Sequence, residues 1–241
     1  MSEIPYAEIE TVFLDVGNTL MSIDFELVAR ELADLGHKVE PAALRRAEAA
    51  ARPAISRTIK SEGTEGPSAF GILLRTVLAK LPAAPAAAAL EELAQNLEPR
   101  IRFPGASDKL WNSVMPGVPA ALRQMRDQGL RLVAVSNADG TVERGLTAQG
   151  LRPMLDLVID SHVVGFQKPH PRIFEIALEQ SGADPARTLH IGDLYAADIV
   201  GARAAGCHAG LIDPHDDWGA LDCAKFRDVS EVARALAEAG A

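Results

Sequence analysis

Several side chains that could do acid–base or metal chemistry come directly after short apolar runs of the sequence, or a few residues beyond them. They supply carboxylates, a hydroxyl, an amide and an ammonium group, and they are Asp15, Ser136, Asn137, Lys168, Asp193 and Asp198. If the runs are parallel strands of one open sheet, the carboxyl ends of the strands meet at one edge, where ligands bind in such sheets. The sequence therefore predicts that these groups share one site.

The charges of this group predict a metal ion. Three carboxylates in one site would raise one another's pKa values and resist joint ionisation. Lys168 and a divalent cation together would balance them, and oxygen ligands favour a hard metal such as Mg²⁺. The same cations would let a carboxylate approach an anionic phosphate, because two like charges about 4 Å apart repel by roughly 4 kcal/mol at an effective dielectric of 20.

The elements that must position these groups can be read from the apolar pattern. Short runs apolar on both faces, as in buried parallel strands, occur at 11–14, 131–135, 157–160, 188–191 and 209–212. Amphipathic stretches of helical length lie between or after them, at 118–128, 171–180, 196–205 and 230–239. Strands that alternate with helices predict an α/β fold with a doubly wound, Rossmann-like parallel sheet.

Residues 21–112 interrupt this alternation and contain no convincing strand. We expect four helices, at about 24–35, 41–60, 67–80 and 84–98, with the second kinked or split at Pro53. The sequence therefore predicts an α/β core formed by residues 1–20 and 113–241, and an all-helical insert at 21–112. We expect the insert to select the substrate. We also expect hinges near 20–23 and 113–117, which would allow the insert to move relative to the core.

Composition excludes several classes of protein. The chain has 241 residues, 48% of them hydrophobic and 24% charged, which is ordinary globular composition and argues against wholesale disorder. A net charge of −9 disfavours binding to nucleic acid or to an anionic membrane. With two distant cysteines, no secretory signal and no apolar stretch of about 18 residues, we expect a cytoplasmic protein. Oligomeric state leaves no signal in the sequence.

Four segments of the chain, in this order, resemble the four signatures of the haloacid dehalogenase (HAD) superfamily of hydrolases. They are VFLDVGNTL around Asp15, LVAVSNADG around Ser136, GFQKPHPRIF around Lys168, and HIGDLYAADIVGARAAG with Asp193 and Asp198. The resemblance spans about 11–212. An insert placed just after the first signature resembles the helical cap of the C1 subfamily, which contains small-molecule phosphatases and haloacid dehalogenases.

The resemblance implies a two-step hydrolysis of a small phosphorylated metabolite. Asp15 would attack phosphorus to form an aspartyl-phosphate, which water then hydrolyses. The resemblance implies that Mg²⁺ is held by Asp15, the Gly17 carbonyl and Asp193, with Asp198 nearby or acting through water. The phosphate- and substrate-binding groups would be Ser136, the Asn137 backbone N–H, Lys168 and Asn18.

One position departs from the family pattern. Many phosphatases of the family carry a second aspartate two positions after the nucleophile, where it protonates the leaving group, and this chain has Gly17 there. A missing general acid costs about 10²–10⁴-fold in rate. We therefore expect slow hydrolysis of alkyl phosphates and better hydrolysis of aryl or acyl phosphates. An acid from the insert such as Asp24 could replace the missing group, and Arg57, Arg75, Arg100 or Arg102 could bind an anionic part of the substrate.

Two other functions compete with a phosphatase. A 2-haloacid dehalogenase uses the same aspartate on carbon and needs no metal, so it would resist a chelator. Such enzymes often carry an aromatic residue at the position of Gly17, and their fourth signature differs from GDLYAAD. A weakly active or non-catalytic binding protein is the second alternative, and the glycine at position 17 is its only support.

Overall fold

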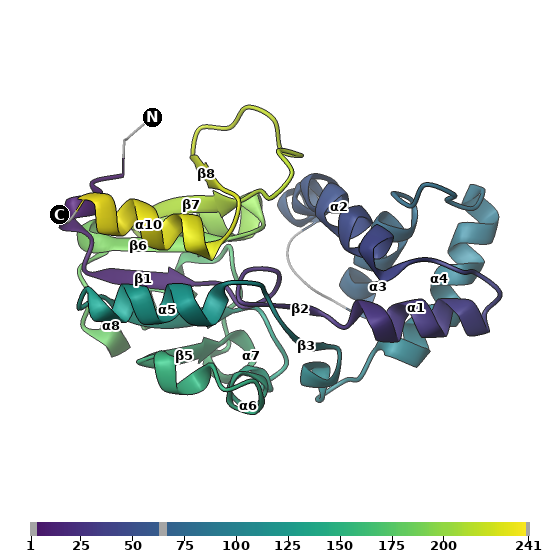
Figure 1. The fold of residues 1–241 in the computed structure, drawn as a ribbon, viewed down its shortest axis with the longest axis horizontal. Coiled ribbons are helices and arrows are strands. Elements are labelled where there is room, and N and C mark those ends of the chain that lie inside the picture. Colours follow the sequence, from purple (N-terminus) through teal and green to yellow (C-terminus); the bar gives the residue numbers. More distant parts are fainter. Residues whose placement is uncertain (1–3, 63–66, 240–241) are drawn as a thin grey trace.

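The computed structural model of the protein describes residues 4–62 and 67–239, and a parallel six-stranded sheet lies at its centre (Figure 1). The strands run in the order β5 (Leu157–Asp160), β4 (Arg131–Ser136), β1 (Thr11–Leu14), β6 (Thr188–Gly192), β7 (His208–Ile212) and β8 (Ala224–Phe226). The five predicted strands and the α/β class are confirmed. Strand β8 was not predicted, because a three-residue edge strand is too short to show a pattern.

The register of the central strands brings their carboxyl ends level. Leu14, the last residue of β1, pairs with Ala134 of β4 on one side and with Ile191 of β6 on the other. The residues that follow these positions therefore emerge at one edge, on both sides of the first strand. This is the crevice in which open α/β sheets bind their ligands.

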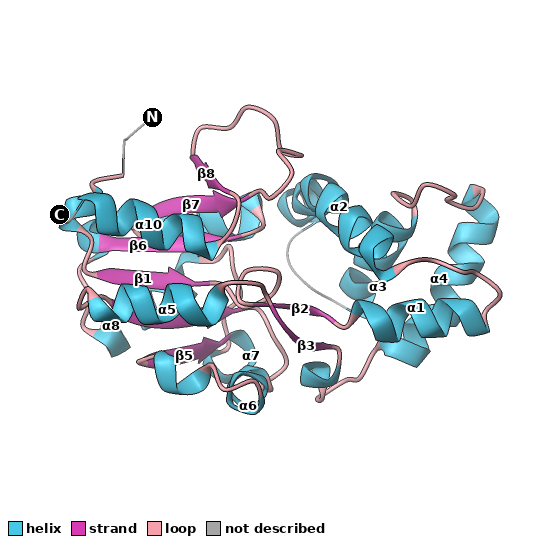
Figure 2. Cartoon of the chain, viewed as in Figure 1, coloured by secondary structure: helices cyan, strands magenta, loops and turns pink. Residues whose placement is uncertain are grey.

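Helices cover both faces of the sheet (Figure 2). On one face, α5 (Val118–Asp127) and α10 (Val229–Ala239) bury their apolar stripes in a core that includes Leu122 and Val232. On the other, α8 (Pro171–Ser181) and α9 (Gly201–Ala204) pack in a core that includes Phe13 and Phe174. The sheet is thus doubly wound, as predicted. Shorter elements complete this part: η1 (Tyr6–Glu8), α6 (Val142–Ala148), η3 (Arg152–Met154), α7 (Ser161–Val164) and η4 (Pro185–Arg187).

The helix expected at 196–205 differs from the prediction. The chain forms a stretch of π-helix, η5 (Tyr195–Val200), before the short α9 begins. The wide turn places Asp198 so close to Gly192 that a Cβ at the glycine would lie 2.2 Å from the Asp198 Cγ. π-Helical turns of this kind often occur at functional sites.

The insert has a hydrophobic core of its own. Its helices are α1 (Phe25–Asp34), α2 (Pro41–Glu62), α3 (Pro67–Leu78) and α4 (Ala87–Ile101), followed by η2 (Ser107–Lys109). They bury side chains that include Leu32, Leu44, Leu78 and Leu97. The second helix is continuous through Pro53, so of the two expectations for this residue, a kink or a split, the split is wrong. None of the described helices combines the length and apolar character that crossing a bilayer requires.

Two short strands connect the insert to the core, and the prediction of no strand within 21–112 is wrong there. Strand β2 (Met21–Ile23) enters the insert, and β3 (Trp111–Val114) leaves it, and they pair antiparallel. Each strand has three or four residues, and its partner lies about ninety residues away in the chain. No local pattern could therefore have revealed the pairing.

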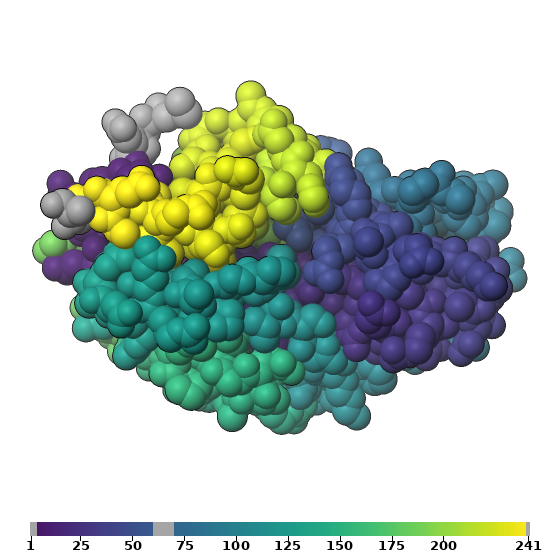
Figure 3. Space-filling model, in the orientation of Figure 1, coloured from purple at the N-terminus to yellow at the C-terminus, as the bar shows by residue number. Residues whose placement is uncertain are grey.

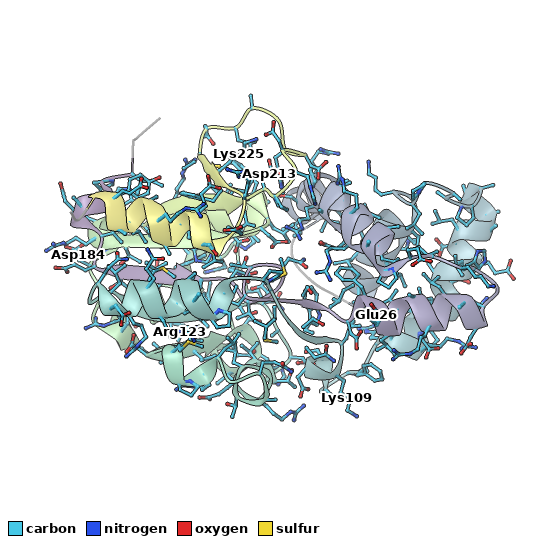
Figure 4. All side chains as sticks on the ribbon, viewed as in Figure 1. Glu26, Lys109, Arg123, Asp184, Asp213 and Lys225 are labelled. Atoms are coloured by element: carbon cyan, nitrogen blue, oxygen red, sulfur yellow. The ribbon has the colours of Figure 1, made fainter. Side chains whose placement is uncertain are left out.

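The insert also touches the core across the ends of β6 and β7, where Figure 3 shows α2 against the loop that precedes β8. Arg46 pairs with Asp217 of this loop at 2.6 Å, and Ser56 Oγ accepts a hydrogen bond from the Ala196 N–H at 2.8 Å. Asp213, next to Lys225 in Figure 4, anchors the loop by pairing with the Lys225 ammonium at 3.1 Å and accepting the Asp217 N–H. The insert is thus held over the strand ends.

Candidate active site

A cavity of about 570 Å³ lies between the strand ends and the insert. The groups that the sequence assigns to the core side of the site all line it: Asp15, Gly17, Asn18, Ser136, Asn137, Lys168, Asp193 and Asp198. They come from positions 15 to 198 of the chain, and the parallel register brings them together. The predicted convergence of three carboxylates and one ammonium group is therefore present in the structure.

Lys168 joins two of the carboxylates. Its Nζ lies 2.5 Å from Asp15 Oδ1 and 2.7 Å from Asp198 Oδ1, and the Lys168 residue is only 2% exposed. The two carboxylates hold the pKa of this ammonium group above its usual value, although burial alone would lower it. Lys168 is therefore charged, and it neutralises part of the negative charge around Asp15.

Asp198 is saturated with protein hydrogen bonds. Its Oδ1 accepts from Lys168 and lies 3.0 Å from His190 Nε2, while Oδ2 accepts from the Leu194 N–H at 2.9 Å. Burial opposes the charged form of Asp198, but Lys168 and His190 outweigh it and lower the carboxyl pKa. Burial lowers the pKa of His190, so the imidazole is neutral. Asp198 thus holds Lys168 in place, and its oxygens already have partners.

The Asn137 side chain fixes the segment that carries Lys168. Its Oδ1 accepts the Lys168 N–H at 2.7 Å, and its Nδ2 donates to the Lys168 carbonyl at 2.9 Å. This pair of bonds leaves the backbone N–H of Asn137, rather than its side chain, for a ligand. Ser136, at the end of β4, is 5% exposed and lines the cavity beside it.

Two residues of the insert reach the same site, and sequence reasoning missed both. Glu48 and Arg52 lie one turn apart on α2, are 2% and 4% exposed, and pair at 2.7 Å. Arg52 Nε also lies 3.3 Å from Asp193 Oδ2. Asn18 Nδ2 is close to both acids, 2.9 Å from Glu48 and 3.2 Å from Asp193. In sequence, this i,i+4 pair among alanines looks like an exposed salt bridge, so only the tertiary fold reveals it.

The site carries more buried negative charge than its own cations balance. Four carboxylates, those of Asp15, Glu48, Asp193 and Asp198, pair with two charged cations among the described side chains, Lys168 and Arg52. Burial, together with the Asp198 charge and against the pull of Lys168, raises the pKa of Asp15 to about 6. Burial also raises the pKa of Asp193 well above its usual value, despite the attraction of Arg52. Both shifts indicate a site that would gain from an added cation.

The donor set fits Mg²⁺ in chemistry, since the candidate ligands are all oxygens. The buried Asn18 Oδ1 also lacks a hydrogen-bond partner. Within the described residues, however, no three His, Cys, Asp or Glu side chains form a ready metal site. Instead, Lys168 lies against Asp15 and Asp198, and Arg52 lies against Oδ2 of Asp193.

An aromatic ring lies beside Gly17, where a side chain at this position would project. A Cβ placed on Gly17 would lie 3.2 Å from Cζ3 of Trp111, the first residue of β3. The ring, which lines the cavity, thus covers the side of the backbone from which a residue at position 17 would project. Trp111 was not singled out in the sequence, because only the β2–β3 pairing brings it back to Gly17.

The other charged candidates of the insert lie mostly elsewhere. Asp24 caps α1 by accepting the Leu27 N–H at 2.9 Å, and it is not among the residues that line the cavity. Arg75 pairs with Glu91 and Arg100 with Glu31. Of the four arginines considered from the sequence, only Arg102 lines the cavity.

Solved structures and known proteins resemble the chain to different extents. The HAD-hydrolase YfnB of Bacillus subtilis superposes with a TM-score of 0.64 and 20% identity, covering 95% of this chain and 98% of that one. This likeness shows the fold. Haloacid dehalogenase-like hydrolase domain-containing protein 3 of Bos taurus is 44% identical over 107 residues, which make up 44% of this chain and 42% of that protein.

Glyceraldehyde 3-phosphate phosphatase of Methanothermobacter thermautotrophicus is 32% identical over 131 residues, covering 50% of this chain and 58% of that protein. Both matches thus span about half the length of the relatives. The sequence model of haloacid dehalogenase-like hydrolases, in contrast, matches residues 9–206, which hold every core residue of the site described above. The chain belongs to the haloacid dehalogenase-like hydrolase family.

Proposed function

We propose that the protein is a Mg²⁺-dependent phosphatase that hydrolyses a small phosphorylated metabolite through an aspartyl-phosphate on Asp15. The observation that carries the proposal is the position of Lys168, which touches Asp15 and Asp198 at the wall of the cavity. An ammonium group beside a buried carboxylate lets that carboxylate approach an anionic phosphate with less repulsion.

Each core residue has a role in this reaction. Asp15 forms a bond to phosphorus while the ester bond breaks, and water then hydrolyses the aspartyl-phosphate. The Ser136 hydroxyl, the Asn137 backbone N–H and Lys168 hold the phosphoryl oxygens as charge develops on them. Asp198, through its short contact with Lys168, keeps the ammonium group charged and in place.

Asp15, the Gly17 carbonyl and Asp193 would hold the metal ion, with Asp198 close by or linked through water. When bound, Mg²⁺ supplies positive charge that neutralises the surplus of carboxylates and the phosphate oxygens. Asn18 contributes a side-chain amide beside Asp193, from which it would contact the substrate.

The relatives support the reaction class. One of them is named glyceraldehyde 3-phosphate phosphatase, and another, 34% identical over 122 residues, is the phosphoserine phosphatase of Thermus thermophilus. Both act on small phosphate esters, as their names state. We propose a substrate of the same class, with the cavity of about 570 Å³ and the apolar side chains of the insert setting its size.

A panel of phosphorylated metabolites and 4-nitrophenyl phosphate, each assayed with Mg²⁺ and with EDTA, tests this function. We expect hydrolysis that requires Mg²⁺ and is lost in Asp15→Asn. Release of halide from 2-haloacids in the presence of EDTA would instead identify a dehalogenase. No turnover of any phosphate at saturating Mg²⁺ would identify a binding protein.

A further inference from the structure

The guanidinium of Arg52 has one nitrogen that the protein does not use. Its Nε and Nη2 donate to Glu48 at 3.1 and 2.7 Å, and Nε approaches Asp193. Nη1 is buried and has no hydrogen-bond partner. Among the buried side-chain atoms that lack a partner in the described part of the chain, this is the one that belongs to a cation. A buried charged donor without a partner is costly, and an anionic ligand atom would remove the cost.

Glu48 holds this guanidinium in one orientation. Both Glu48 oxygens accept from Arg52, and Oε1 also accepts from Asn18 of the core. A fork of donors fixed in this way is characteristic of arginines that bind oxyanions. The insert therefore presents a preoriented cation to the same cavity that Asp15 lines.

Arg52 lies on the side of the cavity where the leaving group of the reaction must depart. Attacking and leaving oxygens lie roughly in line on opposite sides of phosphorus. Asp15 stands on the core side of the cavity, so the leaving oxygen must face the insert, which carries α2. At Gly17, where the general acid of related phosphatases would project, there is no side chain, and Trp111 covers the position.

We propose that Arg52 binds the leaving-group oxygen and stabilises its negative charge, in place of the proton that a general acid would give. The substrates favoured by such a site are aryl and enol phosphates, which are esters of acidic hydroxyls, and acyl phosphates, which release a carboxylate. The proposal rests on the proposed phosphatase function and adds a catalytic residue and a substrate class to it.

The step balances without a proton from the enzyme. A bond forms between an Asp15 oxygen and phosphorus, and the bond between phosphorus and the ester oxygen breaks, with the electron pair staying on that oxygen. Arginine keeps its protons in proteins, so Arg52 contributes charge and hydrogen bonds only. The leaving group departs as an oxyanion and takes a proton from water.

A series of aryl phosphates with leaving groups of graded pKa tests the proposal. The quantity to measure is the slope of log kcat/KM against leaving-group pKa, because kcat/KM reports the step in which the leaving group departs. Saturating Mg²⁺ is used throughout, since Arg52 touches Asp193. We expect Arg52→Met to steepen the slope, with a loss of a few fold for 4-nitrophenyl phosphate and about 100-fold for phenyl phosphate.

Three further variants make the result specific. Arg52→Lys keeps the positive charge, but a lysine lacks the forked donors needed to hydrogen-bond Glu48 and the leaving oxygen at the same time. Its slope should therefore lie between those of the wild type and Arg52→Met. Glu48→Gln should shift the slope in the same direction by less. Arg102→Met removes another arginine that lines the cavity but pairs with Glu98, and it should leave the slope unchanged.

An equal loss for every leaving group in Arg52→Met, with the wild-type slope retained, would overturn the proposal. If Arg52→Met does not fold, the Arg52→Lys slope decides: a steeper slope supports the role and an unchanged slope overturns it. Wild-type protein that hydrolyses none of the esters with Mg²⁺ would refute the phosphatase function itself, which is a distinct outcome.

Discussion

The Trp111 ring lies 3.2 Å from the point that a Cβ on Gly17 would occupy, so a side chain added at Gly17 must push the indole aside. Gly17→Asp would restore a carboxylic acid near the leaving group, but in tight contact with the ring. We expect the ratio of kcat/KM for alkyl phosphates to that for aryl phosphates to rise about tenfold. This is less than the rate factor of about 10²–10⁴ that a well-placed general acid supplies. Combining the change with Trp111→Leu should raise the ratio further.

The control for this prediction is Gly17→Asn, which has nearly the same shape and no acidic proton. It should leave the ratio at the wild-type value. An equal effect of Asn and Asp, or no change in the double variant, would show that the site does not lack an acid.

Removing the ammonium group between Asp15 and Asp198 should destabilise the folded protein. Lys168→Met leaves two buried carboxylates without their shared counter-charge, and breaking a buried ion pair costs about 3–5 kcal/mol. Urea unfolding in EDTA measures this loss in the free energy of unfolding. Lys80→Met, at an exposed lysine, should change it by less than about 0.5 kcal/mol. Equal stability of the two variants would contradict the charge balance described here.

Mg²⁺ should raise the thermal stability of the protein, because the folded site gains a cation that the unfolded chain does not bind. A concentration one hundred times Kd adds about 2.7 kcal/mol. Asp193→Asn removes a proposed ligand and should abolish most of the shift in Tm. Glu26→Gln, on the exposed side of α1 (Figure 4), should keep it. A shift of the same size in Asp193→Asn would place the metal elsewhere.

Asp139 links the core to the end of the insert, and its contribution to stability should depend on pH. Its carboxylate accepts hydrogen bonds from Ser107 Oγ and from Thr141 Oγ1, both at 2.7 Å. Burial opposes the charged form, but these hydrogen bonds prevail and lower the carboxyl pKa. A lowered pKa means that the stabilisation is present at neutral pH and is lost as the pH falls below the usual value of about 4.

Asp139→Asn should therefore reduce the free energy of unfolding by about 1 kcal/mol at pH 7, the scale of one hydrogen bond. The difference from the wild type should shrink at pH 3. Chemical unfolding at the two pH values measures it, with the exposed Asp127→Asn as the control. A difference that grows on acidification would contradict the assigned hydrogen bonds.

The core side of the site could be predicted because it follows from strand order and register. Asp15, Ser136 and Asp193 each come at the end of a strand with a clear apolar run, and parallel pairing places such residues at one edge. Lys168 could be predicted from its signature, although the contacts that orient it, with Asn137 and Asp198, depend on the folded loops.

The insert side could not be predicted, since it depends on how two bodies with separate cores meet. Glu48 and Arg52 enter the site because α2 lies over the strand ends, and no helical periodicity records that placement. Trp111 reaches Gly17 through the pairing of β2 with β3 across the whole insert. These three residues are the ones on which leaving-group chemistry is proposed to depend.

The most direct test of the central claim is rapid acid quenching during turnover of 4-nitrophenyl phosphate with Mg²⁺, followed by mass spectrometry of the peptide that contains Asp15. A phosphoryl group on Asp15 that is absent with EDTA is the predicted result. Hydrolysis that continues undiminished in Asp15→Asn, with no phosphoryl group on this peptide in the wild type, would contradict the account.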